Sequence, residues 1–155
     1  MRSSRPKVLQ ALAGRPMLAH VIDCADALGA ADVCVVYGHG GDAVPEAFPG
    51  RRVRWVLQAE QLGTGHAVQQ AMPGTDDANT VLILFGDVPL IRPATLEALM
   101  AAGDRGDVAV LTVDMQDPHG YGRIVRRDGR VVKIVEQKDA SKAEQAITEI
   151  NTGVL

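Results

Sequence analysis

The chain contains the run Val81-Leu82-Ile83-Leu84-Phe85-Gly86-Asp87-Val88-Pro89-Leu90. Five consecutive apolar residues without polar alternation predict a strand over 81–85 that is buried on both faces, as in parallel sheets covered by helices. Gly86 permits close approach of a ligand to the backbone, and Pro89 cannot continue a β-ladder. The run therefore predicts the central strand of an α/β fold.

Asp87 is predicted to lie just beyond the carboxyl end of this strand. In open α/β sheets, ligands bind in the crevice outside the carboxyl ends of the strands. Mg²⁺ typically takes one or two carboxylates from a protein and completes its shell with water and phosphate oxygens. Asp87 is therefore a candidate ligand for a phosphate-bound Mg²⁺. The alternative, that Asp87 only begins a turn or caps a helix, fits the same pattern.

Composition narrows the class of protein. The 155 residues suffice for one domain or most of one, and an apolar fraction of 46% suffices for a core. The net charge of −3 provides no basic field of the kind that favours nucleic-acid binding. No signal peptide or membrane-spanning run is recognisable, so we expect a cytoplasmic protein with no membrane partner. Cys24 and Cys34 have no metal-binding or redox spacing and are expected to be reduced thiols.

Helix and strand patterns alternate on both sides of the central run. Helices are predicted from Pro16 to Gly29, over 67–72 and from Pro93 onward, and strands over 33–37, 53–57 and 107–113. This alternation predicts a doubly wound, Rossmann-like parallel sheet. The two termini do not look like those of a complete domain, because the chain closes at 150–155 within a strand-like pattern.

Two residues near the predicted strands are weaker candidates for ligand contacts. Lys7 follows Pro6 in a short segment predicted to be extended, and a lysine on a stiff loop suits a phosphate as a point charge. A solvated surface lysine is the simpler explanation of the same pattern. His39 lies in a glycine-rich loop, where an exposed side chain is expected more often than a ligand contact.

Gln58 leaves the strand predicted over 53–57 at its carboxyl end. Its amide carries both a donor and an acceptor, which reading the edge of a nucleobase requires. Gly63 and Gly65 permit tight backbone approach, and Thr64 is placed to cap the following helix. The two-glycine loop matches neither the dinucleotide fingerprint nor the Walker loop, so the pattern alone does not specify a nucleotide.

The last third of the chain changes to a hairpin pattern. A glycine-rich loop enters a strand at 117–125, an Asp-Gly turn lies within 127–130, and a return strand covers 131–136. Ser141 and Glu144 form a capping box for a short helix. Glu136 ends the return strand, where its carboxylate could accept hydrogen bonds from sugar hydroxyls or pair with Lys138 or Lys133.

Five sequence blocks occur together in an order that resembles one family. The resemblance is to the bacterial bifunctional N-acetylglucosamine-1-phosphate uridylyltransferases / glucosamine-1-phosphate acetyltransferases, and it covers essentially the whole chain. The Gln-Leu-Gly-Thr-Gly-His-Ala run is specific for UDP-N-acetylhexosamine pyrophosphorylases. The blocks are Pro6-Lys7-Val8-Leu9, Leu57-Gln58-Ala59-Glu60-Gln61-Leu62-Gly63-Thr64-Gly65-His66-Ala67, Gly86-Asp87-Val88-Pro89-Leu90, Gly120-Tyr121-Gly122-Arg123-Ile124 and Glu149-Ile150-Asn151-Thr152-Gly153.

The resemblance implies a nucleotide-diphospho-sugar transferase fold and a reaction. UTP and N-acetylglucosamine 1-phosphate would give UDP-N-acetylglucosamine and pyrophosphate, with Mg²⁺ as cofactor. Asp87 and Lys7 would be the catalytic residues. By the family pattern, Lys7 would bind nucleotide or sugar phosphate, Gln58 with Gly63 and Thr64 would read the uracil, Asp87 would hold Mg²⁺, and Gly122, Glu136 and Asn151 would bind the N-acetylglucosamine moiety.

The sequence also departs from the family pattern. The family begins with a strand and a Gly-x-Gly-Thr-Arg phosphate loop, and it has a second metal-binding asparagine and a β-helix acetyltransferase domain that holds a homotrimer; none of these falls within residues 1–155. We therefore expect residues 1–155 to be a partial uridylyltransferase domain that is poorly folded and inactive by itself. The alternatives are a sugar-1-phosphate nucleotidyltransferase with another base or sugar, a non-catalytic nucleotide-sugar binding fragment, and a truncated product without function.

Overall fold

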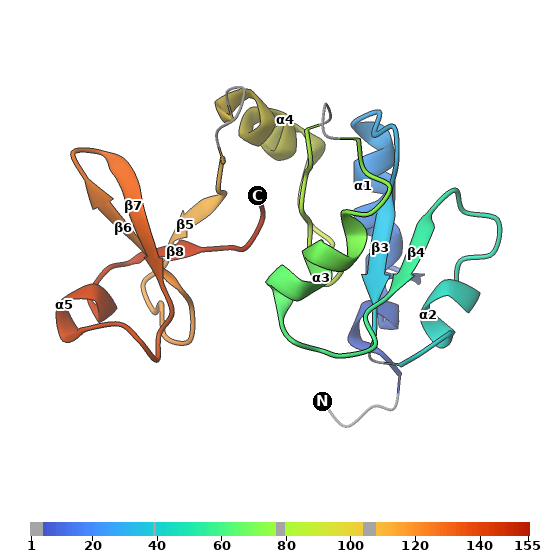
Figure 1. The fold of residues 1–155 in the computed structure, drawn as a ribbon, viewed down its shortest axis with the longest axis horizontal. Coiled ribbons are helices and arrows are strands. Elements are labelled where there is room, and N and C mark those ends of the chain that lie inside the picture. The colour runs from blue at the N-terminus through green and yellow to red at the C-terminus, as the bar shows by residue number, and fades with distance from the viewer. Residues whose placement is uncertain (1–4, 39, 77–79, 104–107) are drawn as a thin grey trace. The chain divides into compact units, whose positions relative to one another are not determined.

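A computed structural model describes residues 5–38, 40–76, 80–103 and 108–155 (Figure 1). The chain divides into two compact units, Met1–Glu97 and Ala98–Leu155, and each is described by itself. His39, a weak candidate from the sequence, lies outside the described residues. None of the helices in the described part of the chain combines the length and the apolar character of a membrane span.

The first unit contains a parallel strand pair and most of the helices. The pair is β3–β4, which runs in register from Cys34 opposite Arg54 to Tyr37 opposite Leu57. Its elements are η1 (Lys7–Leu9), β1 (Ala11–Leu12), β2 (Arg15–Pro16), α1 (Met17–Ala27), β3 (Cys34–Tyr37), α2 (Ala43–Glu46), β4 (Arg54–Leu57) and α3 (Thr64–Ala71), followed by α4 (Pro93–Ala102), which continues across the boundary between the units.

Helices cover both faces of the β3–β4 pair. On one face, a buried cluster from η1, α1 and the α2 region packs against Val35, Tyr37 and Trp55. On the other face, Val36 shares the lining of a pocket with Ala67 of α3, and Arg54 donates a hydrogen bond to the backbone oxygen of Ala71. Successive side chains of a strand point to opposite faces, so this sandwich follows from the alternation along β3 and β4. It is the α/β arrangement predicted from the sequence.

The strand predicted over 81–85 is not formed. These residues form no β-ladder, and Val81 is 43% exposed while 82–85 are half-buried. An apolar run reports burial, whereas a strand also needs a neighbour that completes its backbone ladder. Gly86 still lies close to the core, since a Cβ on it would come within 3.1 Å of Leu18 and 3.2 Å of Val8. Asp87 therefore follows a packed segment rather than the end of a strand.

Three smaller expectations were also wrong. Lys7 lies in a 3-10 helix rather than in an extended segment. Gly63, not Thr64, is the N-cap of α3, and no side chain caps that helix. Of the strand predicted over 107–113, residue 107 lies outside the described residues; the strand that forms is β5 (Thr112–Asp114), and it pairs antiparallel with β8 rather than joining a parallel sheet. Only the pairing of β5 with β8 depends on a partner distant in sequence, because the 3-10 turn at Lys7 and the N-cap at Gly63 are formed by neighbouring residues.

The second unit is an antiparallel sheet with the strand order β5–β8–β6–β7. Besides β5, its strands are β6 (Arg123–Arg127), β7 (Arg130–Val135) and β8 (Glu149–Asn151), with the short helix α5 (Lys142–Gln145) between β7 and β8. The capping box predicted from Ser141 and Glu144 is present at the start of α5. Ile124, Val135 and Ile150 form part of its buried core.

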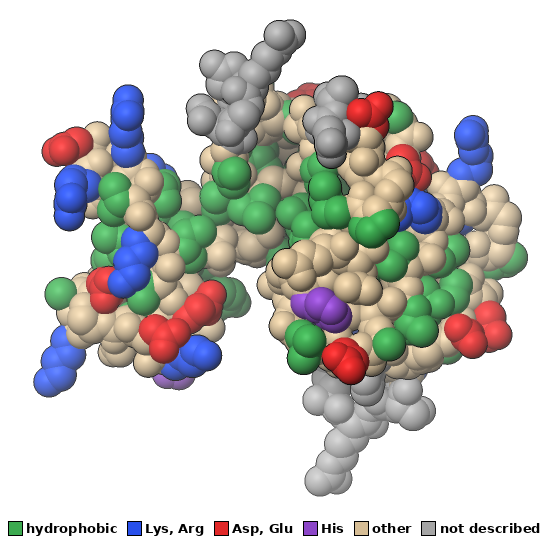
Figure 2. Space-filling view, in the orientation of Figure 1, with side chains coloured by type: hydrophobic (Ala, Val, Ile, Leu, Met, Phe, Trp, Pro, Cys, Tyr) green, Lys and Arg blue, Asp and Glu red, His purple; other side chains and the backbone are tan. Residues whose placement is uncertain are grey.

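The hairpin of this unit closes as its Asp-Gly pair predicts. Asp128 has φ 50° and Gly129 has φ 77°, the left-handed conformations that a tight two-residue turn requires. The pairing of β6 with β7 then shifts between Val125 and Arg126 at a β-bulge. Figure 2 shows acidic and basic side chains interspersed on the visible surface, which agrees with the small net charge of −3.

Candidate functional site

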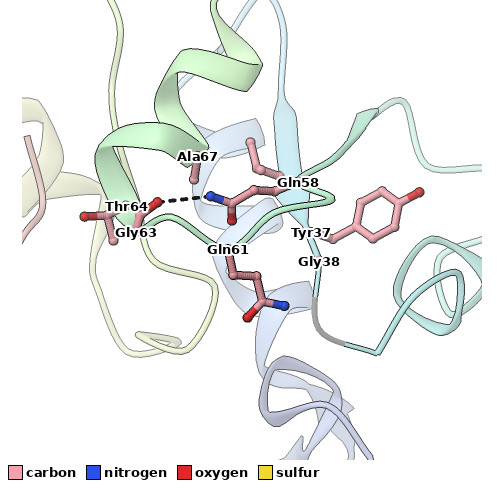
Figure 3. Close-up of a pocket in the computed structure, with 8 residues that line it drawn as sticks. Tyr37, Gly38, Gln58, Gln61, Gly63, Thr64 and Ala67 are labelled. Carbon is pink, nitrogen blue, oxygen red and sulfur yellow. Dashed lines mark hydrogen bonds between the residues drawn. The ribbon is translucent and has the colours of Figure 1, made fainter.

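A pocket of about 370 Å³ lies in the first unit, beside the carboxyl ends of β3 and β4. Its lining combines strand ends with the loop that precedes α3 and with the start of α3. Figure 3 shows the amide of Gln58 directed toward Gly63, whereas the ring of Tyr37 points away from that amide. The lining residues are Val36, Tyr37, Gly38, Gln58, Gln61, Gly63, Thr64 and Ala67.

Two glycines shape this pocket. Gly63 has φ 101°, a conformation that L side chains rarely adopt, and it turns the chain into α3. Gly38 lies so close to β4 that a Cβ on it would be 2.7 Å from the backbone oxygen of Gln58. The backbone N–H of Gln58 also donates to the oxygen of Tyr37 at 2.7 Å. Gln58 is therefore anchored through its backbone before its side chain enters the pocket.

The side chain of Gln58 is held by two hydrogen bonds. Its Nε2 lies 3.0 Å from the backbone oxygen of Gly63 and 3.0 Å from Nδ1 of His66. His66 belongs to α3, and its Nε2 lies 3.2 Å from Nε2 of Gln70, one helical turn later. The amide nitrogen of Gln58 is thus engaged within the protein, which leaves Oε1 as the acceptor of the side chain.

Lys7 and Asp87 form an ion pair in the same unit. Nζ of Lys7 lies 2.6 Å from Oδ2 of Asp87, with side chains 64% and 32% exposed, respectively. The two residues are 80 positions apart, so the packing of η1 against the core brings them together. Exposed pairs of this kind contribute little to stability, about 0–1 kcal/mol. The pair therefore contributes little to holding the fold, and both of its side chains are at least partly accessible from solvent.

The residues around Asp87 fit a metal ion only if a ligand supplies most of its shell. No group of three or more His, Cys, Asp or Glu side chains suitable for a metal occurs within the described ranges. Mg²⁺ commonly uses one or two carboxylates together with waters and substrate phosphates, and Asp87 is a partly exposed carboxylate. The donor set is thus compatible with Mg²⁺ bound together with a phosphate, and not with a metal caged by protein.

The second unit brings Gly122, Glu136 and Asn151 into one row across three strands. Arg123 pairs with Val135 of β7 and with Ile150 of β8, so the preceding residue, Gly122, lies beside Glu136 and Asn151. The backbone N–H of Asn151 donates to the oxygen of Gly122 at 2.8 Å. A Cβ on Gly122 would lie 3.3 Å from Oε1 of Glu136.

This row offers a hydrogen-bonding gap. Neighbouring strands lie about 4.8 Å apart, so the residues on either side of Gly122 are roughly 10 Å apart and flank a position without a side chain. Oδ1 of Asn151 accepts from the backbone N–H of Gly153 at 2.9 Å, which leaves its amide nitrogen as a donor. Glu136 is exposed, and Lys133, one of its suggested partners, pairs instead with Glu144 at 3.0 Å.

The buried side chain of Arg123 anchors the segments that flank this row. It is only 2% exposed, and it donates to the backbone oxygen of Tyr121 and to Oε1 of Gln137, the latter at 2.6 Å. The same Oε1 accepts from the backbone N–H of Gly120 at 3.3 Å. The guanidinium thereby fixes both the loop that leads into β6 and the segment that leaves β7.

Two carboxylates of this unit are held ionised by their partners. Hydrogen bonds from Arg126, at 2.7 and 2.8 Å, lower the pKa of Glu149. The Ser141 side chain, the Ser141 backbone N–H and Lys133 lower the pKa of Glu144 from its ordinary 4.5 to about 2. Both carboxylates belong to the scaffold, and within the described residues neither has a hydrogen bond or ion pair to a side chain of the Gly122 row.

The structure therefore groups the predicted site residues into three sets. Lys7 contacts Asp87, Gln58 and Thr64 line a pocket with Gly63, and the Gly122 row stands in the second unit. The sequence alone assigns no individual role to Gln61, His66 or Arg123. The predicted helix over 67–72 begins one residue after His66, whereas α3 begins at Thr64 and brings His66 into contact with Gln58.

Comparison with known proteins places the chain among nucleotidyltransferases. A family model, the MobA-like NTP transferase domain, matches residues 1–149. The bifunctional protein GlmU of Thiobacillus denitrificans (strain ATCC 25259 / T1) is 59% identical to this chain over 155 residues. That match covers 100% of the chain and 34% of GlmU, so the chain spans about a third of the length of this relative.

Solved structures share the fold at low identity. HddC from Yersinia pseudotuberculosis, complexed with GMP-PN, has a TM-score of 0.70 and 20% identity over 97% of this chain and 66% of its own. CMP:2-keto-3-deoxy-manno-octonic acid synthetase, complexed with CTP, has a TM-score of 0.67 and 22% identity over 98% of this chain and 68% of its own. The α/β fold predicted from the alternation of helices and strands is thus the fold that these solved structures share.

Proposed function

Because the chain belongs to the MobA-like NTP transferase family, we propose that it binds the substrates of a UDP-N-acetylglucosamine pyrophosphorylase. The proposed reaction converts UTP and N-acetylglucosamine 1-phosphate into UDP-N-acetylglucosamine and pyrophosphate. The observation that carries the proposal is the 59% identity to GlmU over the whole chain, which includes all five blocks that suggested this family. Each of the three sets of site residues is then proposed to bind one part of the substrates.

The pocket around Gln58 is the proposed site of the uracil. Uracil presents an N3–H donor between two carbonyl acceptors. Oε1 of Gln58 is available to accept from N3–H, because both bonds of its amide are made by the nitrogen. The first turn of α3, which begins at Thr64, carries backbone N–H groups without intrahelical acceptors, and these suit the carbonyl oxygens.

Lys7 and Asp87 are the proposed phosphate site. Lys7 would exchange its bond to Asp87 for a bond to a phosphate oxygen, since an exposed ion pair is weakly held. Asp87 would then serve as a ligand for Mg²⁺, which when bound neutralises charge on the phosphates. The choice of Mg²⁺ over other divalent ions is part of the proposal.

The Gly122 row is the proposed site of the N-acetylglucosamine moiety. A carboxylate such as that of Glu136 accepts hydrogen bonds from sugar hydroxyls, and the amide nitrogen of Asn151 donates to a hydroxyl or an acetamido oxygen. Gly122 places no side chain between these two groups, whereas a Cβ there would lie 3.3 Å from Oε1 of Glu136. The arrangement supports recognition of a polar ring rather than of an apolar ligand.

The chemical step needs positioning rather than a protein nucleophile. An oxygen of the sugar phosphate attacks the α-phosphorus of UTP. A new phosphorus–oxygen bond forms while the bond from the α-phosphorus to the bridging oxygen of the β-phosphate breaks, and pyrophosphate leaves with the electron pair. The contribution of the chain is to hold both phosphates in line and to offset their repulsion, with Lys7 as the cation.

Equilibrium binding to a protein that carries this chain tests this proposal. By calorimetry or NMR titration, we expect UTP to bind more tightly than CTP, and N-acetylglucosamine 1-phosphate more tightly than glucose 1-phosphate. Lys7→Met should weaken UTP binding about tenfold, whereas Lys142→Met, the same charge change at an exposed residue of α5, should leave it unchanged. Equal binding of UTP and CTP, or equal effects of the two lysine variants, would contradict the proposal.

The longer protein implied by the family adds further proposals. A cytoplasmic location and a homotrimer with a second, acetyltransferase activity follow from the resemblance. Pyrophosphate release by a protein that carries this chain, measured with UTP and N-acetylglucosamine 1-phosphate, tests the complete reaction.

A further inference from the structure

In the hydrogen-bond chain Gln58–His66–Gln70, both ring nitrogens of His66 face a glutamine nitrogen. This conflict determines which nitrogen of His66 carries the proton. Nδ1 of His66 lies 3.0 Å from Nε2 of Gln58, and Nε2 of His66 lies 3.2 Å from Nε2 of Gln70. A glutamine nitrogen is only a donor, and a neutral imidazole has one acceptor nitrogen and one N–H. One of the two glutamines must therefore turn its oxygen toward the ring.

Gln58 is the glutamine that keeps its orientation. Its Nε2 also donates to the backbone oxygen of Gly63 at 3.0 Å, so turning the amide would place Oε1 against that carbonyl oxygen. Gln70 has no such second bond within the described residues, and it can present Oε1 to His66 by a simple rotation. His66 consequently accepts at Nδ1 and carries its proton on Nε2, which donates to Gln70.

We infer that His66 is a positioning residue that sets nucleobase selectivity through Gln58. Its Nδ1 acceptor, together with the oxygen of Gly63, holds the nitrogen of Gln58 away from the ligand and leaves Oε1 as an acceptor in the pocket. Bases with an N3–H donor, uracil and thymine, match this acceptor. Cytosine has an unprotonated N3 in that place, so two acceptors would meet. This inference rests on the proposed function, because it assumes that the pocket holds a base.

The size of the effect follows from one hydrogen bond. In the wild-type chain, two acceptors oppose rotation of the Gln58 amide, and loss of His66 would leave only the oxygen of Gly63. A neutral hydrogen bond changes such an equilibrium by roughly five- to tenfold. We therefore expect the ratio of UTP to CTP affinity to fall by about this factor, without complete loss of UTP binding.

A first test reads the tautomer directly. Histidine ring nitrogens distinguish protonated from unprotonated sites by their ¹⁵N chemical shifts, and the signals of His66 are identified by their loss in the His66→Phe variant. The expected result in the chain without ligand is a neutral ring with its proton on Nε2. A proton on Nδ1 would overturn the inference, since Gln58 could not then donate to that nitrogen.

A second test compares two substitutions by UTP and CTP titration. His66→Phe keeps an aromatic ring but removes the acceptor, and we expect the UTP/CTP affinity ratio to fall five- to tenfold. His66→Asn places its Oδ1 where Nδ1 of histidine stands, so the ratio should stay within about twofold of wild type.

The outcomes separate this inference from the proposed function. A wild-type chain that binds UTP no better than CTP contradicts the proposed function itself. A wild-type preference for UTP that His66→Phe leaves unchanged contradicts only the role of His66. Equal losses in the phenylalanine and asparagine variants would also overturn the inference, because the ring rather than the acceptor would then be what Gln58 requires.

Discussion

Replacing Gly122 by alanine should separate the stability of the second unit from its proposed sugar binding. Gly122 is buried but does not have a left-handed φ, so alanine fits its backbone. The new Cβ would lie 3.3 Å from Oε1 of Glu136 and 3.6 Å from a methyl group of Ile134. The closer atom is the end of an exposed, flexible side chain that can move outward. We therefore expect the free energy of unfolding to stay equal or to rise by up to about 1 kcal/mol, as glycine-to-alanine changes do at compatible sites.

Sugar binding should respond in the opposite direction. The methyl group would fill the gap beside Glu136 and displace its carboxylate, and a hydrogen bond to a charged group contributes about 1.5–3 kcal/mol. The affinity for N-acetylglucosamine 1-phosphate, measured by NMR titration, should fall roughly 10- to 100-fold. UTP affinity should be unchanged. Gly103→Ala is the matched control, because its Cβ would make only an ordinary contact at 3.5 Å.

Three results would refute this reasoning. The first is an unchanged affinity for the sugar phosphate in Gly122→Ala, which would remove the Gly122 row from the binding site. The second is an equal loss of UTP affinity, which would indicate general damage. The third is a similar loss in Gly103→Ala, which would show that the effect is not specific to the gap.

Two further predictions concern the scaffold of the second unit. Arg123→Met should lower the stability of this unit by about 1–3 kcal/mol, because two acceptors lose their buried donor. The measurement is hydrogen exchange of the β6–β8 amides, since Trp55 reports only on the first unit. Unchanged exchange would contradict the prediction. The lowered pKa of Glu144 should stabilise the unit fully above pH 4.5, with the contribution lost as the pH falls toward 2. Ser141→Ala should flatten this acid dependence in urea titrations at a series of pH values, and an unaltered dependence would show that the capping box is not its source.

The sequence predicted the parts of the fold that depend on neighbouring residues. The capping box at Ser141 and the Asp-Gly turn at 128–129 formed as expected, because each is complete within a few residues. Gly29 lies just beyond the C-cap of α1 with φ 71°, as a helix-ending glycine does. The strand predicted over 81–85 failed because an apolar run cannot show whether a partner strand will complete its ladder.

The candidate site also divides into features that the sequence predicts and features that depend on tertiary packing. The chemical type of Gln58, Asp87 and Glu136 could be read from the sequence, but the same pattern also fitted a turn or cap for Asp87 and a lysine pair for Glu136. The contact between Lys7 and Asp87 and the orientation of the Gln58 amide could not be read, since both depend on packing between segments distant in the chain. Pattern thus identifies the functional group, and tertiary packing determines which of its atoms a ligand meets.

The β-bulge in the hairpin is the clearest case, because it determines the composition of the Gly122 row. The turn sets Arg127 opposite Arg130, and an unbroken register from there would place Gly122 beside Val135. Val132 is the extra residue, and it shifts the remaining pairs by one. Since a shift of one residue exchanges the two faces of a strand, it brings Glu136 to Gly122 and turns Val135 into the core, where it is 3% exposed. A regular hairpin of the same sequence would place an apolar side chain in the proposed sugar site, so the irregularity in the sheet is what makes the row polar.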